Sequence, residues 1–125
     1  MTTNASIQLM FFGNAKQAMD LYTTTFKNSA IDEITYDGEG LIQRAKFHIE
    51  NQSHYCIDSI ADHKFTFTPS FSIFIDFEEE DELTRVLEAL SKGGNTFMPL
   101  DNYGFSKKFT WISDAFGVFW QLNLK

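Results

Sequence analysis

The order of predicted elements repeats once along the chain, and this repeat constrains the fold more than any other feature of the sequence. Alternating and helical apolar patterns predict a strand, a helix and three strands, followed by the same five-element order again. The predicted strands cover residues 6–12, 30–36, 41–49 and 54–60 in the first half, and 70–77, 95–98, 107–113 and 118–124 in the second. We therefore expect an α+β fold of two βαβββ modules.

Two helices are predicted from apolar residues that recur on one helical face. Residues 15–26 have such a face, and Asn14 with Gln17 offers a capping box at its start. In the second half, the acidic run at 78–82 suits the N-terminus of a helix, because carboxylates complement the helix dipole there. The glycine pair at 93–94 is expected to end this helix.

The length of the chain favours a single domain. At 125 residues it can bury a hydrophobic core without disulfides or a structural metal. Within that domain we expect module one at about 5–62 and module two at about 68–125. Residues 61–69 read as a loop that joins them.

Charge and cysteine content limit the classes of function. A formal net charge of −7 disfavours binding to nucleic-acid phosphates or to anionic membrane surfaces. The single Cys56 cannot form an intramolecular disulfide, so no oxidising compartment is implied. The N-terminal residues have neither the basic region nor the apolar run of a signal peptide. These features predict a cytoplasmic protein.

Four stretches resemble one protein family. They read FFGNAKQAMDLYTTTF, AKFHIENQSHYCIDS, FTPSFSIFIDFEEEDEL and, most specifically, LSKGGNTFMPLDNYGFSKKFTWISDAFGVFWQLNL. Together they look like the PhnB-type branch of the vicinal oxygen chelate superfamily, which includes glyoxalase I, bleomycin-resistance proteins and extradiol dioxygenases. The resemblance extends from residue 7 to residue 124.

The resemblance implies a curved mixed sheet shaped like a cup, with helices on its convex face, a pocket inside it and often a homodimer. Some sequences of this type are labelled 3-demethylubiquinone methyltransferases. Because the chain has no glycine-rich loop of the S-adenosylmethionine type after a strand, we do not expect methyltransferase activity.

Metal-dependent members of the superfamily carry one ligand on the first and last strand of each module, typically His, Glu, His and Glu. The resemblance transfers these positions to Ile7 or Gln8, to Ile57 or Asp58, to Ser72 and to Gln121. With Gln8 and Asp58 chosen, the set supplies one anionic ligand, whereas transition metals prefer several imidazole, thiolate or carboxylate groups. We therefore expect no resident cofactor, and a divalent metal is the less favoured alternative.

Alternation in the last strand separates an apolar face from a face with amides, which suits a pocket. Asp58 is the best single acid–base candidate, because a carboxylate enclosed by aromatic rings loses hydration; an exposed aspartate at a strand end is the equal alternative. A loop with aromatic residues precedes the seventh strand, where it either covers the pocket or is anchored to the core. The candidate ligand-binding residues are Gln8, Asp58, Ser72, Phe74, Tyr103, Phe105, Trp111, Phe119, Gln121 and Asn123.

The three histidines and the cysteine give weaker signals. His54 shares a strand face with Cys56 and Asp58 and is the only histidine expected near the pocket; His48 and His63 read as surface residues. Alternate residues on one strand lie roughly 7 Å apart, too far for a hydrogen-bonded relay through Cys56. We expect Cys56 to be a small buried apolar residue.

These features favour a small-molecule-binding protein that holds an apolar or aromatic ligand in the sheet cup without the usual metal. One alternative is a metal-dependent lyase, isomerase or dioxygenase of the same superfamily. Another is an interaction module whose pocket is filled by its own side chains. The sequence does not identify the ligand.

Overall fold

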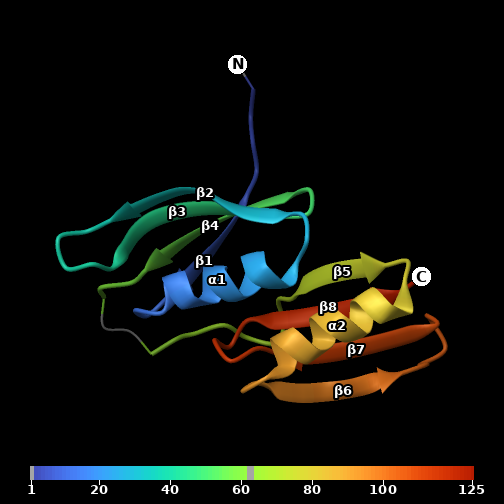
Figure 1. Cartoon of the computed structure of the whole chain (residues 1–125). Coiled ribbons are helices and arrows are strands. Elements are labelled where there is room, and N and C mark those ends of the chain that lie inside the picture. Colours follow the sequence, from blue (N-terminus) through green and yellow to red (C-terminus); the bar gives the residue numbers. More distant parts are fainter. Residues whose placement is uncertain (1, 62–63) are drawn as a thin grey trace. The chain divides into compact units, whose positions relative to one another are not determined.

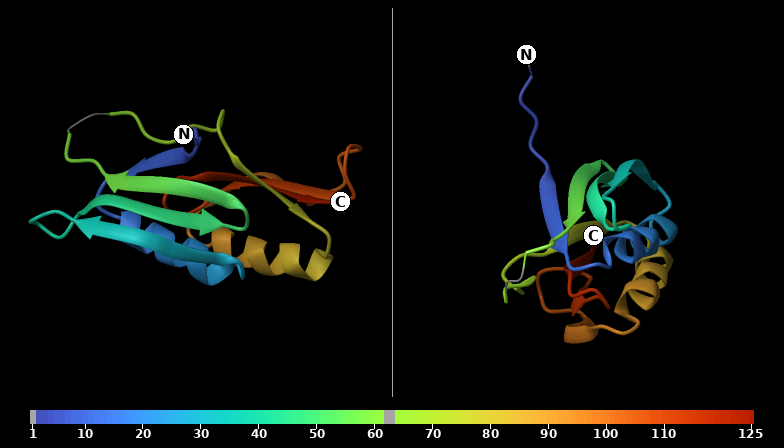
Figure 2. Two further views of the ribbon diagram at one scale, coloured as in Figure 1. Left: turned by 90° about the horizontal axis from the view of Figure 1, so that it is seen from above. Right: turned by 90° about the vertical axis from the view of Figure 1, so that its left-hand side faces the viewer.

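The computed structural model describes residues 2–61 and 64–125 and divides them into two compact units. Unit 1 spans Met1–Lys64 and unit 2 spans Phe65–Lys125. Each unit contains one sheet with one helix against a face of that sheet (Figure 1, Figure 2).

Unit 1 follows the βαβββ order. Its elements are β1 (Ile7–Phe11), α1 (Ala15–Thr25), β2 (Ser29–Tyr36), β3 (Ile42–Ile49) and β4 (Gln52–Asp58). The strand order in the sheet is β1-β4-β3-β2. β1 and β4 run parallel because α1 and two strands intervene between them, and the other neighbours are antiparallel.

Unit 2 repeats the same order and pairing. Its elements are β5 (Ile73–Phe77), α2 (Glu80–Ser91), β6 (Asn95–Asp101), β7 (Lys108–Ser113) and β8 (Phe119–Leu124). The strand order is β5-β8-β7-β6, with β5 parallel to β8 and the other pairs antiparallel. Two βαβββ modules confirm the predicted α+β fold class.

One strand extends further than predicted, through a proline. β6 continues to Asp101, although the predicted strand stopped before Pro99. β6 is an edge strand, and an edge position tolerates proline because no neighbour needs its missing N–H group. α2 ends at Ser91 as predicted, and Gly93 follows it with a φ of 74°, in the left-handed region that glycine adopts easily.

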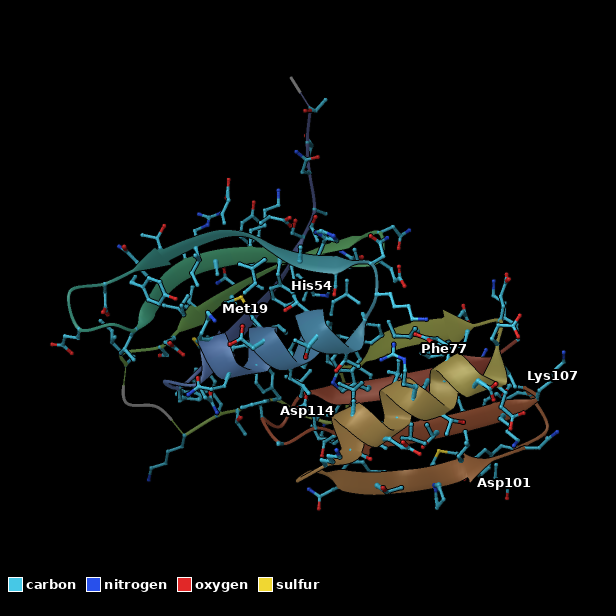
Figure 3. The ribbon with its side chains drawn as sticks, viewed as in Figure 1. Met19, His54, Phe77, Asp101, Lys107 and Asp114 are labelled. Atoms are coloured by element: carbon cyan, nitrogen blue, oxygen red, sulfur yellow. The ribbon has the colours of Figure 1, made fainter. Side chains whose placement is uncertain are left out.

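The core of unit 1 lies between α1 and one face of its sheet. Leu9, Phe47 and Cys56 project from three strands toward this helix, and Met19 and Tyr22 project from α1. Tyr22 stacks on Phe47 with ring centroids 6.1 Å apart. Figure 3 shows Met19 and His54 in the layer between the helix and the sheet.

A buried carboxylate fastens the start of α1. Asp58, at the end of β4, accepts hydrogen bonds from the backbone N–H groups of Gly13 at 2.9 Å and Ala15 at 3.0 Å through Oδ1. Its Oδ2 accepts a third from Ile42 at 3.0 Å. Asn14 makes no side-chain capping bond, so the predicted capping box is wrong and a distant residue provides the cap.

Unit 2 contains a second buried carboxylate, Asp114, in the turn between β7 and β8. Its Oδ1 accepts from the backbone N–H groups of Phe116 at 2.9 Å and Val118 at 3.1 Å. Its Oδ2 accepts from Trp120 Nε1 at 2.9 Å. Trp120 is fully buried on the helix-facing side of β8, so this bond joins the turn to the core.

Removal of the Asp58 carboxylate should destabilise unit 1 strongly. Asp58→Ala leaves three backbone N–H groups without their acceptor, two of them buried, and we expect a loss of about 3 kcal/mol or more in the free energy of unfolding. Asp58→Asn keeps one acceptor oxygen and should lose less. Urea denaturation of each variant measures the effect.

Asp76→Ala is the matched control, because Asp76 is exposed and its carboxylate accepts one side-chain hydrogen bond, from Asn123. We expect this variant to stay within about 1 kcal/mol of the parent. Equal losses for the Asp58 and Asp76 variants would contradict the structural role of Asp58.

Candidate functional site

The face of the unit 2 sheet that points away from α2 is called here the open face of unit 2. Its direction follows from the register, because Trp120 and Leu122 are fully buried on the helix side and the residues between them point the other way. Phe74 of β5 and Trp111 of β7 are both register partners of Gln121 and therefore share its face. The members of the open face on these three strands are Phe74, Asp76, Phe109, Trp111, Ser113, Phe119, Gln121 and Asn123.

Three rings on the open face form the aromatic cluster, defined as Phe97, Trp111 and Phe119. The ring of Phe97 lies 5.6 Å from that of Trp111 and 5.3 Å from that of Phe119, both in tilted arrangements. Phe97 is 46% exposed, and Phe74 on the other side of Gln121 is 53% exposed. Large apolar rings that remain open to solvent on one face can pack against a flat ligand.

Phe97 is the site residue that sequence reasoning missed. The register of β6 and β7 shifts between Thr96 and Met98, so Phe97 is an extra residue in an irregularity of the strand. Such bulges redirect a side chain relative to simple alternation. One sequence signal could have identified Phe97: it is a large aromatic residue in a predicted strand and has no place in the predicted core.

Polar side chains border the aromatic cluster on β5 and β8. Gln121 Nε2 donates to Ser72 Oγ at 3.4 Å, and Asn123 Nδ2 donates to Asp76 Oδ1 at 2.9 Å. The structure thus brings together five predicted ligand-binding residues with Phe97: Ser72, Phe74, Trp111, Phe119 and Gln121. Asn123 lies further along β8, where Asp76 holds its amide.

The aromatic loop before β7 is packed against its own strand. Phe105 meets the buried Phe109 edge-on with ring centroids 5.0 Å apart, and Tyr103 approaches Phe109 at 6.3 Å. The Tyr103 hydroxyl donates to the carbonyl of Pro99. Because Phe109 belongs to the open face, these contacts hold the loop at the edge of that face, and Phe105 remains 64% exposed.

The open face of unit 1, which points away from α1, has a different chemistry. Gln8, Tyr55 and Lys46 are aligned across β1, β4 and β3. The Arg44 guanidinium carbon lies 4.4 Å from the centre of the Tyr55 ring, and Lys46 Nζ lies 5.8 Å from it. Gln8 is exposed there, as alternation predicted, while Tyr55 with its two cations was not predicted as a site.

The prediction that Asp58 faces a pocket is wrong. Asp58 is on the helix side of the sheet, 8% exposed, and its three backbone hydrogen bonds occupy both carboxylate oxygens. Ile57 is the β4 residue that shares the face of Gln8, through Met10, its partner on β1. The role of Asp58 is therefore structural, and the acid–base assignment is withdrawn.

The positions that carry metal ligands in metal-dependent relatives are thus poor donors in this chain. With Ile57 in place of Asp58, they offer two amides, one aliphatic side chain and one hydroxyl: Gln8, Ile57, Ser72 and Gln121. This donor set does not fit a divalent transition metal. Within residues 2–61 and 64–125, no three His, Cys, Asp or Glu side chains gather closely enough to hold a metal ion.

His54 is buried in the core of unit 1 and not near a pocket. Its ring stacks on Phe47 at 5.0 Å, and neither ring nitrogen has a hydrogen-bond partner among the described residues. Burial lowers the pKa of His54 below its usual 6.5, and the nearby backbone of Gln52 offsets only part of this effect. The imidazole therefore stays neutral in the folded protein at neutral pH.

The remaining candidate residues from the sequence are one cysteine and two histidines. Cys56 is buried as expected, and burial, with a smaller effect of Asp58, raises the pKa of its thiol to about 12. His48 lies on the surface, 3.0 Å from Asp32 Oδ2. His63 lies outside the described residues. No helix among the described residues is long and apolar enough to cross a membrane.

Solved structures define the class of protein. A PhnB protein from Bacillus cereus, described under a 3-demethylubiquinone-9 3-methyltransferase heading, is 40% identical, covers 98% of this chain and 100% of its own, and has a TM-score of 0.94. Protein PA1353 from Pseudomonas aeruginosa is 21% identical, with 99% and 98% coverage and a TM-score of 0.86. The fosfomycin resistance protein FosX from Listeria monocytogenes is 14% identical, with 100% and 94% coverage and a TM-score of 0.64, a likeness in fold alone.

The chain has the glyoxalase-like fold of the vicinal oxygen chelate superfamily. The family model described as 3-demethylubiquinone-9 3-methyltransferase matches residues 3–123, so the chain belongs to this PhnB-like family. No curated protein is significantly similar to it. The predicted superfamily and branch are confirmed.

The buried His54 should make the stability of the protein depend on pH. Because its pKa is lower in the folded than in the unfolded state, the unfolded chain binds the extra proton first as the pH falls through 6.5. The contribution of the neutral His54 to the free energy of unfolding is therefore fully present above pH 6.5. It decreases below that pH, by at most about 1.4 kcal/mol per pH unit for one proton.

His54→Phe is expected to abolish this component and to retain the stacking on Phe47. Urea denaturation from pH 7.5 to 5 measures the difference in slope between the parent and the variant. Identical slopes would contradict the assignment of the pH dependence to His54.

Proposed function

We propose that the protein binds a flat apolar or aromatic small molecule on the open face of unit 2, without a resident divalent metal. The observation that carries this proposal is the aromatic cluster, in which the half-exposed ring of Phe97 lies over Trp111 and Phe119. Gln121 and Ser72 border the cluster and can orient a ligand by donating or accepting hydrogen bonds.

The residues on this face suit binding better than catalysis. An amide and a hydroxyl do not act as a general base near neutral pH, and the carboxylate of Asp76 on this face accepts a hydrogen bond from Asn123. The thiol of Cys56 and the carboxylate of Asp58 belong to the core of unit 1. We therefore favour sequestration or carriage of a compound over turnover.

The methyltransferase description of the family does not change this proposal. Methyl transfer from a nucleotide-type donor needs a site for that donor, and the chain lacks the glycine-rich loop that typically cradles it after a strand. The homodimer and the cytoplasmic location expected from the sequence accompany the proposal as predictions. Sedimentation equilibrium measures the first.

Planar aromatic compounds should bind the protein, and loss of the Phe97 ring should weaken that binding. For Phe97→Ser we expect about a fivefold rise in the dissociation constant, because one aromatic contact is worth roughly 0.5–1.5 kcal/mol. Titration of naphthalene-sized compounds, followed by two-dimensional NMR of the ¹⁵N-labelled protein, measures the change.

Phe71→Ser is the matched control, because Phe71 is similarly exposed and its ring is not among those that stack in the aromatic cluster. It should leave the dissociation constant unchanged. Binding that is equally weakened in both variants would indicate a nonspecific apolar surface. No binding of any planar compound would favour an interaction module in place of a ligand-binding protein.

The protein purified without chelators should contain far less than one equivalent of Zn, Ni, Mn or Fe. The positions available for ligands supply no anionic group, so dehydration of the ion would be uncompensated. Elemental analysis by mass spectrometry measures the content. A stoichiometric metal that disappears in Gln121→Leu would establish the metal-dependent alternative; Asp58 variants cannot serve here, because Asp58 holds the backbone.

A further inference from the structure

Two unused hydrogen-bonding groups lie on neighbouring strands within the proposed site. Trp111 Nε1 is buried and has no acceptor among the described residues. Gln121 is the register partner of Trp111. Its Nε2 donates to Ser72, and its Oε1 accepts no hydrogen bond from the described residues.

An unpaired indole N–H group is costly, and the same unit shows the usual solution. The N–H group of a buried tryptophan normally has an acceptor, and a buried donor left without one costs about 1–3 kcal/mol. Trp120 on the same sheet donates to Asp114 at 2.9 Å. Trp111 therefore differs from its neighbour in retaining a donor that a ligand can use.

Trp111 and Gln121 are directly paired across β7 and β8 and share one face. Side chains of directly paired residues on antiparallel strands have Cβ atoms about 4.5–5.5 Å apart. One small ligand with an acceptor and a donor can therefore reach both side chains. The aromatic cluster around them suits a flat ring.

We infer that the ligand is a neutral, planar cyclic amide, with a carbonyl group next to a ring N–H group. This inference rests on the proposed function and specifies its ligand class. The ligand carbonyl accepts from Trp111 Nε1, and the ligand N–H group donates to Gln121 Oε1. The ring packs against Phe119 and Phe97.

Charge on the open face supports a neutral ligand. Asp76 is the one charged residue among the members of that face defined above, and it already pairs with Asn123. The nearby Lys108 lies in register with Leu124 on the helix side and donates to Glu80 at 2.6 Å. A carboxylate or phosphate on the ligand would have no cation to compensate its desolvation there.

We expect access to the buried Trp111 Nε1 to involve a movement of Phe97. The Phe97 ring lies 5.6 Å from the Trp111 ring, is half-exposed, and comes from an irregular position in an edge strand. No strand of the unit 2 sheet pairs with the outer side of β6, so a rotation of the Phe97 side chain does not disturb a neighbouring strand there. We expect the Phe97 ring to move and cover the bound ligand.

Three probes of matched size test the inference: 2-quinolone with a carbonyl and an N–H group, 1-methyl-2-quinolone with the carbonyl alone, and naphthalene with neither. The sequence has two tryptophans, so the ¹⁵N-labelled protein shows two indole N–H signals. We expect the Trp111 signal to move downfield with both quinolones and not with naphthalene. The Trp120 signal, already hydrogen-bonded to Asp114, should move little and is the internal control.

Variants separate the two hydrogen bonds. Trp111→Phe keeps a ring but removes the donor, and should reduce the affinity for both quinolones about tenfold, toward that of naphthalene. Gln121→Leu should remove the preference for 2-quinolone over its N-methyl derivative. Gln43→Leu, at an exposed glutamine on β3 of unit 1 that belongs to neither hydrogen bond, is the matched control and should change neither.

The outcomes distinguish the inference from the proposed function. Equal affinity for naphthalene and 2-quinolone, with an unmoved Trp111 signal, would overturn the cyclic-amide inference while leaving aromatic binding intact. A Trp111 signal that is already as far downfield as that of Trp120 without ligand would also overturn it. Failure of all three probes to bind would overturn both.

Discussion

The interaction on which each unit depends is a buried carboxylate that accepts three hydrogen bonds. Asp58 holds the N–H groups of Gly13, Ala15 and Ile42 at the end of the unit 1 sheet, and so sets where α1 begins. Asp114 holds the turn before β8 and the indole of Trp120. A charged acceptor shared by several donors forms stronger hydrogen bonds than a neutral one, and it tolerates burial because both of its oxygens are hydrogen-bonded.

The two carboxylates act on the helix-facing side of the sheets. In unit 1 Asp58 holds the start of α1, and in unit 2 Asp114 holds Trp120, which is fully buried on the helix side of β8. In unit 2 this lets large rings such as Phe74 and Phe97 remain half-exposed while Trp120 and Leu122 are fully buried on the other face. The duplicated modules have diverged in this respect, because unit 1 shows Arg44 and Lys46 around Tyr55 where unit 2 shows aromatic rings.

Periodicity alone predicts most of the fold but only part of the site. Alternation of two assigns β8 correctly, because its two faces differ sharply in polarity. It fails at β4, where His54, Cys56 and Asp58 form a polar-looking row that the helix nevertheless covers. Which face a helix covers depends on the three hydrogen bonds of Asp58 to distant residues. Phe97 was not predicted as a site residue for another physical reason: the register of β6 shifts at this position, so simple alternation does not give the direction of its side chain.

Gln121 is paired with Phe74 on one side and with Trp111 on the other, on the open face of unit 2. A carboxylate there would lie between the rings of Phe74 and Trp111 and would need a cation to offset its desolvation, and this face offers none. An amide carries no charge, donates to Ser72 and keeps an oxygen that can accept a further hydrogen bond. Under the proposed function, an amide at this position therefore suits a neutral ligand with donor and acceptor groups better than it suits a metal ion.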